Sequence, residues 1–269
     1  MDGCSNGGYG RRMTPTIVDD IETTREGSTL IVRFARPAKK NALTIAMYER
    51  LNAALAEAAA DKTVRAVVFG STSETFTAGN DLADFMQNPP SGSDSPVFRF
   101  IMGLAAFEKP LIAAVDGKAI GLGLTMLLHC DFVYATERAS LVAPFVNLGL
   151  VPEAASSLLL PKLIGHARAA EVLLLGEPVS AQQAFSWGLV SAIVTPDQLM
   201  PRALQTAQKL AERAPTAVKL SKALMKDTTQ VKERMQQEGA HFVSQLQSPE
   251  VAEAIGAFFE KRKPDFSQF

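Results

Sequence analysis

The sequence has few residues of the kinds that bind metals or form covalent cross-links. It contains 269 residues, of which two are cysteines and three are histidines. Cys4 lies in a glycine-rich start and Cys130 in an apolar segment, so we predict neither a disulfide framework nor a metal site. The histidines lack ligand spacing and stand at positions His129, His166 and His241. We expect each to be structural, and we expect a reducing compartment.

A strong net charge and long apolar runs are also lacking. The formal net charge is −1, which provides no general attraction for nucleic acid or for an anionic membrane. No basic stripe with interleaved aromatic residues is present, and no apolar run reaches the ~20 residues that a membrane helix needs. We therefore predict no nucleic-acid partner, no membrane partner and, by default, a cytoplasmic location.

Composition and patterning divide the chain into three parts. Residues 1–14 contain glycine, serine and asparagine without the apolar core of a secretory signal, so we predict a disordered leader. Residues 15–200 form the predicted core, in which Gln87–Ser95 is a short low-complexity loop. Residues 201–269 show amphipathic helical spacing, which predicts a helical C-terminal subdomain.

Strands and helices are predicted to alternate in the core. Helical spacing covers 43–60 and 97–107, and a further apolar helix is predicted over 124–130. The predicted strands are short runs with the apolar character of buried parallel strands, at 29–34, 64–70, 110–115 and 131–135. This alternation predicts an α/β fold with a parallel or mixed sheet covered by helices.

Two glycine-containing turns and one isolated carboxylate are the candidate chemical groups. The turns are Phe76–Leu82 and Ile120–Leu124, where backbone N–H groups at a helix start favour an oxyanion or a phosphate. Either segment is equally compatible with a plain strand-to-helix turn. Glu153 follows eight uncharged residues, and burial there raises a carboxyl pKa whereas a position in the first turn of a helix lowers it. Pro152-Glu153 is also a good helix start, and both alternatives stay open.

Taken together, these segments resemble the crotonase (enoyl-CoA hydratase/isomerase) family from about Leu30 to Phe266. Five segments match in order, at residues 36–43, 76–82, 109–123, 176–194 and 258–266. The resemblance implies a crotonase-type spiral of ββα units over 15–200 and a helical C-terminal region. It also implies an enzyme of fatty acid metabolism that binds an acyl-CoA thioester, assembles as trimers or pairs of trimers, and needs no cofactor besides the coenzyme A of its substrate.

The resemblance also assigns site residues. The backbone N–H groups of Asn80 and Leu122 match the oxyanion hole that binds the thioester oxygen. The residues matching the coenzyme A site are Ala38, Lys39, Lys40, Ala78, Asn80, Asp81 and Leu122. Phe258 and Lys261 match residues that complete this site, from the same or a neighbouring subunit.

The departures from the family pattern bear on the reaction. Family hydratases activate water with two glutamates, and those positions are Thr125 and Phe145 here. Threonine is no useful base at neutral pH and phenylalanine carries no transferable proton, so we expect ordinary hydration to be absent or very weak. The segment 144–157 is instead similar to the Δ3,Δ2-enoyl-CoA isomerase branch, which implies that Glu153 is the lone catalytic carboxylate. A hydratase, another crotonase reaction and a non-catalytic acyl-CoA-binding subunit remain the alternatives.

Overall fold

The computed structural model describes residues 16–90, 92 and 94–269. The leader predicted over 1–14, which includes Cys4, lies outside the described residues. Two positions of the predicted loop over 87–95 also lie outside them.

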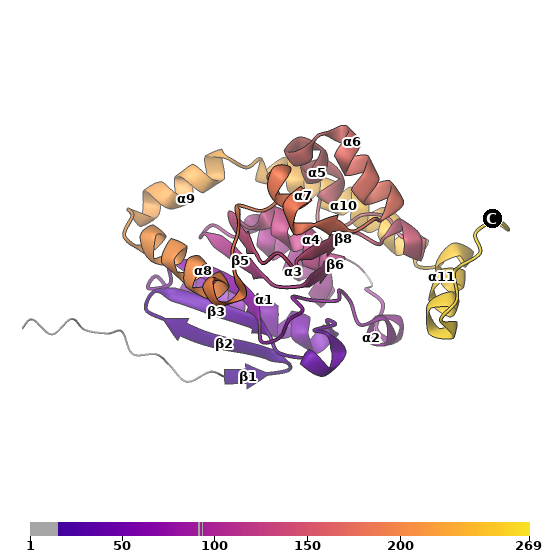
Figure 1. Ribbon diagram of the computed structural model, residues 1–269, viewed down its shortest axis with the longest axis horizontal. Helices are drawn as coiled ribbons and strands as arrows, with labels where there is room; N and C mark the ends of the chain where they lie inside the picture. Colours follow the sequence, from indigo (N-terminus) through magenta and orange to yellow (C-terminus); the bar gives the residue numbers. More distant parts are fainter. Residues whose placement is uncertain (1–15, 91, 93) are drawn as a thin grey trace, which may run out of the picture.

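The central element is a seven-stranded sheet (Figure 1). Its strands, in spatial order, are β1 (Thr16–Val18), β2 (Ile21–Glu26), β3 (Thr29–Phe34), β4 (Ala66–Ser71), β5 (Leu111–Val115), β7 (Phe132–Ala135) and β10 (Ala192–Ile193). The pairs β1–β2 and β2–β3 are antiparallel, and all pairs from β3 to β10 are parallel. Strands β4 and β5 are buried on both faces, which explains their continuous apolar sequence.

Helices cover both faces of this sheet. Helices α1 (Ile45–Ala60) and α3 (Pro96–Ala106) pack against one another and belong to the larger core on one face. Helix α8 (Pro196–Ala211) packs on the other face against alternate residues of β4 and β5. The helical C-terminal region therefore starts at Pro196, and its first helix crosses position 201. These elements confirm the predicted α/β arrangement.

A second, three-stranded sheet lies beside the first. It consists of β6 (Lys118–Ile120), β8 (Ser140–Val142) and β9 (Val179–Ser180), with β6 and β8 parallel. Strand β6 leads into α4 (Leu122–Thr125), which continues as the 3₁₀ helix η2 (Met126–His129). The single helix predicted over 124–130 is thus wrong in detail, because the chain tightens into a 3₁₀ turn after Thr125.

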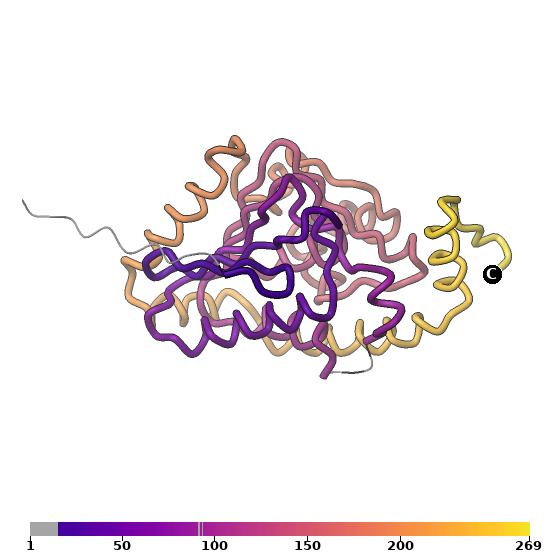
Figure 2. Tube along the Cα trace, turned by 90° about the horizontal axis from the view of Figure 1, so that it is seen from below, coloured from indigo at the N-terminus to yellow at the C-terminus, as the bar shows by residue number. Residues whose placement is uncertain are grey.

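The remaining elements are short helices around the sheets and longer helices at the C-terminal end. The short ones are η1 (Pro37–Lys39), α2 (Leu82–Gln87), η3 (Val146–Leu148), α5 (Ser156–Ile164), α6 (His166–Ala170), the π-helical η4 (Glu171–Leu175) and α7 (Ala181–Ser186). The longer ones are α9 (Pro215–Leu224), α10 (Thr228–Gln245) and α11 (Pro249–Glu260). Helix α11 stands apart from the body at one end of the molecule (Figure 2). None of the described helices is both long and apolar enough to cross a membrane.

Candidate active site

A cavity of about 680 Å³ brings together segments that are distant in sequence. It is lined from η1, from the 75–85 segment, from the start of α4, from the 144–153 loop and from α10 and α11. Among the predicted site residues, those that line it are Ala38, Lys39, Lys40, Ala78, Asn80, Asp81, Leu122, Glu153 and Phe258. Lys261 does not line the cavity; it is exposed and forms the C-cap of α11.

The backbone on both sides of Asn80 is fixed by hydrogen bonds to Leu43. Leu43 donates from its N–H to the carbonyl oxygen of Gly79 at 2.8 Å and accepts from the N–H of Asp81 at 2.9 Å. This is a parallel bridge, in which the N–H of Asn80 itself faces away from Leu43. Within the described part of the chain, that N–H donates no hydrogen bond. The Asn80 side chain is held from α1, because the Tyr48 hydroxyl donates to Oδ1 at 2.5 Å.

A close backbone approach places Leu122 on the same cavity. A Cβ on Gly79 would lie 2.9 Å from the carbonyl oxygen of Ile120, so only glycine permits this contact. Gly121 has φ +58° and donates from its N–H to Val142 at 2.8 Å. The next N–H, that of Leu122, opens α4 and therefore has no partner within the helix. The structure thus brings to one cavity two N–H groups that have no partner among the residues it describes.

Glu153 lies in a loop three residues before α5, which begins at Ser156. The interpretation of Pro152-Glu153 as a helix start is therefore wrong, because Ala154 and Ala155 adopt left-handed backbone angles that an α-helix cannot contain. The carboxylate is 6% exposed and accepts one long hydrogen bond, from the Thr125 hydroxyl at 3.4 Å. Among residues 16–90, 92 and 94–269, no cation pairs with it.

Burial decides the proton affinity of Glu153. Burial and, after it, the negative charge of Glu238 raise the pKa of the carboxyl, the Thr125 hydrogen bond lowers it, and the net result is a pKa of about 7. Both protonation states are consequently populated at neutral pH. The other carboxylate of the cavity behaves differently: burial raises the pKa of Asp81, but hydrogen bonds from Arg36 and Asp84 outweigh it and lower the pKa overall. Arg36 pairs with Asp81 at 2.7 Å.

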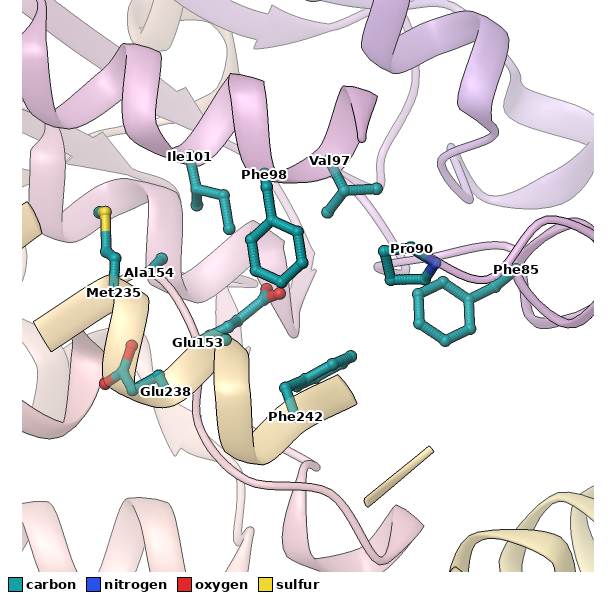
Figure 3. Close-up of a pocket in the computed structure, with 11 residues that line it drawn as sticks. Phe85, Pro90, Val97, Phe98, Ile101, Glu153, Ala154, Met235, Glu238 and Phe242 are labelled. Atoms are coloured by element: carbon teal, nitrogen blue, oxygen red, sulfur yellow. The ribbon is translucent and has the colours of Figure 1, made fainter. Parts of the chain in front are cut away.

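A narrow pocket continues the cavity past Glu153 (Figure 3). The two spaces share Phe85, Glu153 and Phe242 as lining residues. The pocket has a volume of about 10 Å³, which is room for about one water molecule. Its walls are mainly apolar and come from α3 and α10, so Glu153 lies at the junction between a wide entrance and a tight apolar end.

Two residues that the sequence analysis missed support this site. Tyr48 lies on the buried face of α1, where a phenolic hydroxyl needs a partner, and that requirement was the available signal. Glu238 lies on α10 in a buried stripe with Val231, Met235 and Phe242. The sequence signal for Glu238 was a carboxylate at the helical spacing of the apolar residues on the buried face of α10. Among the described residues, no group of His, Cys, Asp and Glu side chains is arranged to hold a metal ion.

Comparisons with known proteins agree on one family. The family model described as enoyl-CoA hydratase/isomerase matches residues 24–269. Enoyl-CoA delta isomerase 2 of Rattus norvegicus is 35% identical over 212 residues, which are 77% of this chain and 54% of that protein. The chain therefore spans about half the length of that relative. The 2,3-dehydroadipyl-CoA hydratase of Escherichia coli (strain K12) is 33% identical over 252 residues, covering 93% of this chain and 99% of that protein.

A solved structure has the same fold. The crystal structure of an enoyl-CoA hydratase/isomerase from Pseudoalteromonas atlantica T6c matches with a TM-score of 0.89 and 42% identity, over 93% of this chain and 100% of that chain. The predicted fold class is therefore confirmed, including the helical C-terminal region. The relatives include both an isomerase and a hydratase, so they establish the family and not the individual reaction.

Proposed function

The chain belongs to the enoyl-CoA hydratase/isomerase (crotonase) family, and within that family we propose that it moves the double bond of a 3-enoyl-CoA to the 2-position. One observation carries this proposal. A single unpaired carboxylate, Glu153, lies on the same cavity as the unpaired N–H groups of Asn80 and Leu122, and its pKa is raised to about 7. A proton shuttle requires such a group, which both takes and returns a proton near neutral pH.

The chemistry follows from this arrangement. The Glu153 carboxylate removes a proton from C2 of the substrate, and the electron pair moves onto the thioester oxygen to give a dienolate. The two N–H groups stabilise that oxygen, and an oxyanion-hole donor typically contributes about 3–4 kcal/mol. The protonated Glu153 then returns the proton at C4, which leaves the 2-enoyl product. No oxidant, reductant or further cofactor is needed, because the substrate and the product are isomers.

Hydration is disfavoured by the other groups of the cavity. Thr125 is fully buried, and its hydroxyl is directed at Glu153. Phe145 lines the cavity as a buried ring. Neither residue can act as a second base, so these two positions do not supply the group that would activate a water molecule while Glu153 serves as the acid. The apolar surroundings also exclude water that would compete for the dienolate.

The wide part of the cavity fits the coenzyme A portion of the substrate. Its exposed rim carries Lys39 and Lys40, whose charges suit the phosphate groups of coenzyme A. We assign Ala38, Ala78 and Asp81 to the same region, with Phe258 closing it from α11. Lys261 does not line the cavity. It can contact coenzyme A only if the end of α11 moves, or if it reaches the cavity of a neighbouring subunit.

The experiment is to replace Glu153 by Gln, which keeps the shape and removes the base. We expect isomerisation of 3-hexenoyl-CoA to fall by about 10³-fold, within the range that general acid–base groups contribute. Binding of butanoyl-CoA, a saturated ligand, should change by less than about twofold. Glu171→Gln, at an exposed glutamate outside the cavity, is the matched control and should retain full activity.

The same assay separates the alternatives. Water addition to 2-hexenoyl-CoA that exceeds isomerisation in the wild type would establish a hydratase and refute the proposal. Tight binding of butanoyl-CoA without any turnover of either enoyl substrate would indicate a non-catalytic binding subunit.

A further inference from the structure

The backbone that carries Glu153 is held in an unfavourable conformation. Ala154 and Ala155 both have φ +56°, a left-handed geometry that residues with a Cβ rarely adopt, and here two occur in succession. Both alanines are fully buried. Such a conformation persists only where the surroundings hold it in place, and it is common beside functional groups.

Glu238 is the main side chain that holds this segment. Its Oε2 accepts from the Ala155 N–H at 2.6 Å. Its Oε1 accepts from the N–H and the hydroxyl of Ser157, at 3.0 and 2.5 Å. On the opposite side of the segment, the carbonyl oxygen of Ala154 lies 2.8 Å from Nε2 of His129. Residues 154–157 are therefore clamped between α10 and η2.

Burying the carboxylate of Glu238 costs folding free energy, which is explained if this side chain serves to hold residues 154–157. The side chain is 6% exposed and lies in the stripe of α10 that contains Met235 and Phe242. An apolar residue would pack there without burying a carboxylate. Figure 3 shows Glu238 on α10 beside the Glu153 loop, with the Glu153 carboxylate directed to the pocket below Phe98. Glu238 also lines this pocket, but both of its carboxylate oxygens accept hydrogen bonds from the loop, at Ala155 and Ser157.

We propose that Glu238 is a positioning residue, which fixes the left-handed segment 154–155 and so aims the Glu153 carboxylate into the cavity. This inference rests on the proposed function of Glu153 and extends it to a residue 83 positions away from Ala155. Glu238 touches no reacting atom. It acts through the loop, so its loss should reduce turnover more than ligand binding.

The charge of Glu238 gives a second, separable effect. The groups that face Glu153 are Glu238, Tyr48 and the Thr125 hydroxyl, and the groups that face Glu238 are Ser157, Ala155 and Arg234. After burial, the negative charge of Glu238 is the next cause of the raised pKa of Glu153. Removing that charge lowers the pKa of Glu153, whereas a shorter acid at position 238 keeps the charge and loses the hydrogen-bond reach.

The test compares Glu238→Gln with Glu238→Asp, using the full chain. We expect kcat for 3-hexenoyl-CoA to fall by about 100-fold in both, the loss typical of a misplaced catalytic group. The affinity for butanoyl-CoA should stay within about twofold of the wild type. Because the ionised Glu153 is the base, kcat/KM of the wild type rises with pH through about 7. This rise should move to lower pH in Glu238→Gln and stay in place in Glu238→Asp.

The control is Gln230→Ala, which removes another α10–α5 contact, the hydrogen bond from Lys162, without touching the Glu153 loop. It should leave kcat and the pH profile unchanged. Folded Glu238 variants that show wild-type kcat overturn the proposal. So does a loss of kcat that tracks melting temperature alone and is equalled by Gln230→Ala.

A measurement without turnover separates this proposal from the proposed function. Titration of ¹³C-carboxyl-labelled glutamates by NMR in the ligand-free protein should show that the Glu153 transition moves to lower pH in Glu238→Gln. If the wild type isomerises nothing but this shift is present, the proposed function fails while the electrostatic link between Glu238 and Glu153 stands. An unchanged Glu153 transition in Glu238→Gln refutes the electrostatic link regardless of activity.

Discussion

Glu153 shows how a useful proton affinity is obtained at the expense of stability. A carboxyl whose pKa is raised to about 7 by burial binds its proton more tightly in the folded chain than in the unfolded chain. The free energy of unfolding therefore decreases as pH rises from the pKa of the unfolded chain, near 4.5, to the pKa of the folded chain, about 7. Above that interval the protein contains a buried, unpaired carboxylate. The base that the reaction needs is the same group that destabilises the fold.

This leads to a prediction that is independent of any substrate. Glu153→Gln, which cannot ionise, should be more stable than the wild type at pH 8, by on the order of 3 kcal/mol, and this difference should shrink to about 1 kcal/mol at pH 5. Urea unfolding followed by circular dichroism at the two pH values measures this difference. The control Glu171→Gln should show no such pH dependence. Equal stability of wild type and Glu153→Gln at pH 8 would contradict the burial of Glu153 described above.

The strands of the core were predictable because their signals are local. The predicted strand over 29–34 coincides with β3, those over 110–115 and 131–135 begin one residue before β5 and β7, and that over 64–70 begins two residues before β4 and ends one residue before β4 does. Strands β6, β8 and β9 contain only two or three residues each and carry no periodicity that a sequence can show. Strand β2 escaped prediction because its residues are mostly polar and half-buried.

Site residues could be predicted from the sequence where a local motif sets their position. They could not be predicted where their position depends on contacts with residues far away in the sequence. The residues Asn80 and Leu122 reach the same cavity because a glycine permits the close approach of their two turns, and that glycine is visible in the sequence. The role of Glu153 depends on burial, and burial depends on α3 and α10. Glu238 belongs to a helix more than 80 residues away, so no local pattern connects it with Ala155.

Helices α3 and α10 together limit the acyl chain that fits beyond Glu153. The Phe98 ring of α3 packs against the backbone of α10 at Gly239, where a Cβ would lie 2.9 Å from Cε1 of the ring. This contact closes the narrow pocket, whose volume of about 10 Å³ leaves no room for a long chain. We therefore expect short 3-enoyl thioesters to be the better substrates.

Phe98→Ala should relax this limit. The ratio of kcat/KM for 3-dodecenoyl-CoA to that for 3-hexenoyl-CoA should rise by about tenfold or more, because even one additional buried methylene contributes a factor of that order. Arg99→Ala on the same helix is exposed and serves as the control, with an unchanged ratio. If the wild type already prefers the longer substrate and Phe98→Ala leaves the ratio unchanged, the acyl chain of the substrate does not enter the narrow pocket beside Phe98.

The distribution of exposed apolar side chains suggests how copies of the chain associate. Helix α9 exposes Leu220 and Leu224, its C-cap residue Met225 is also exposed, and the separate helix α11 exposes Phe258 and Phe259. Apolar groups gathered in this way on a surface are typical of interaction sites. Helices α9 and α11 lie at opposite ends of the molecule in both views (Figures 1 and 2). Two different patches facing different directions suit a head-to-tail contact, which forms a ring when the rotation from one copy to the next closes.

The family resemblance implies trimers or pairs of trimers, and Leu224 is the residue at which to test whether α9 takes part in their contact. Leu224 is 88% exposed on a single chain, so Leu224→Asp should not disturb the monomer fold but should place a charge in the contact. Light scattering coupled to size exclusion should give three or six times 28.9 kDa for the wild type and a smaller particle for the variant. Gln208→Asp, which adds the same charge at an exposed polar position of α8, should keep the wild-type mass. A monomeric wild type would exclude the ring, whereas an intact trimer of Leu224→Asp would place the contact away from α9 and leave the exposed rings of α11 as the surface to alter next.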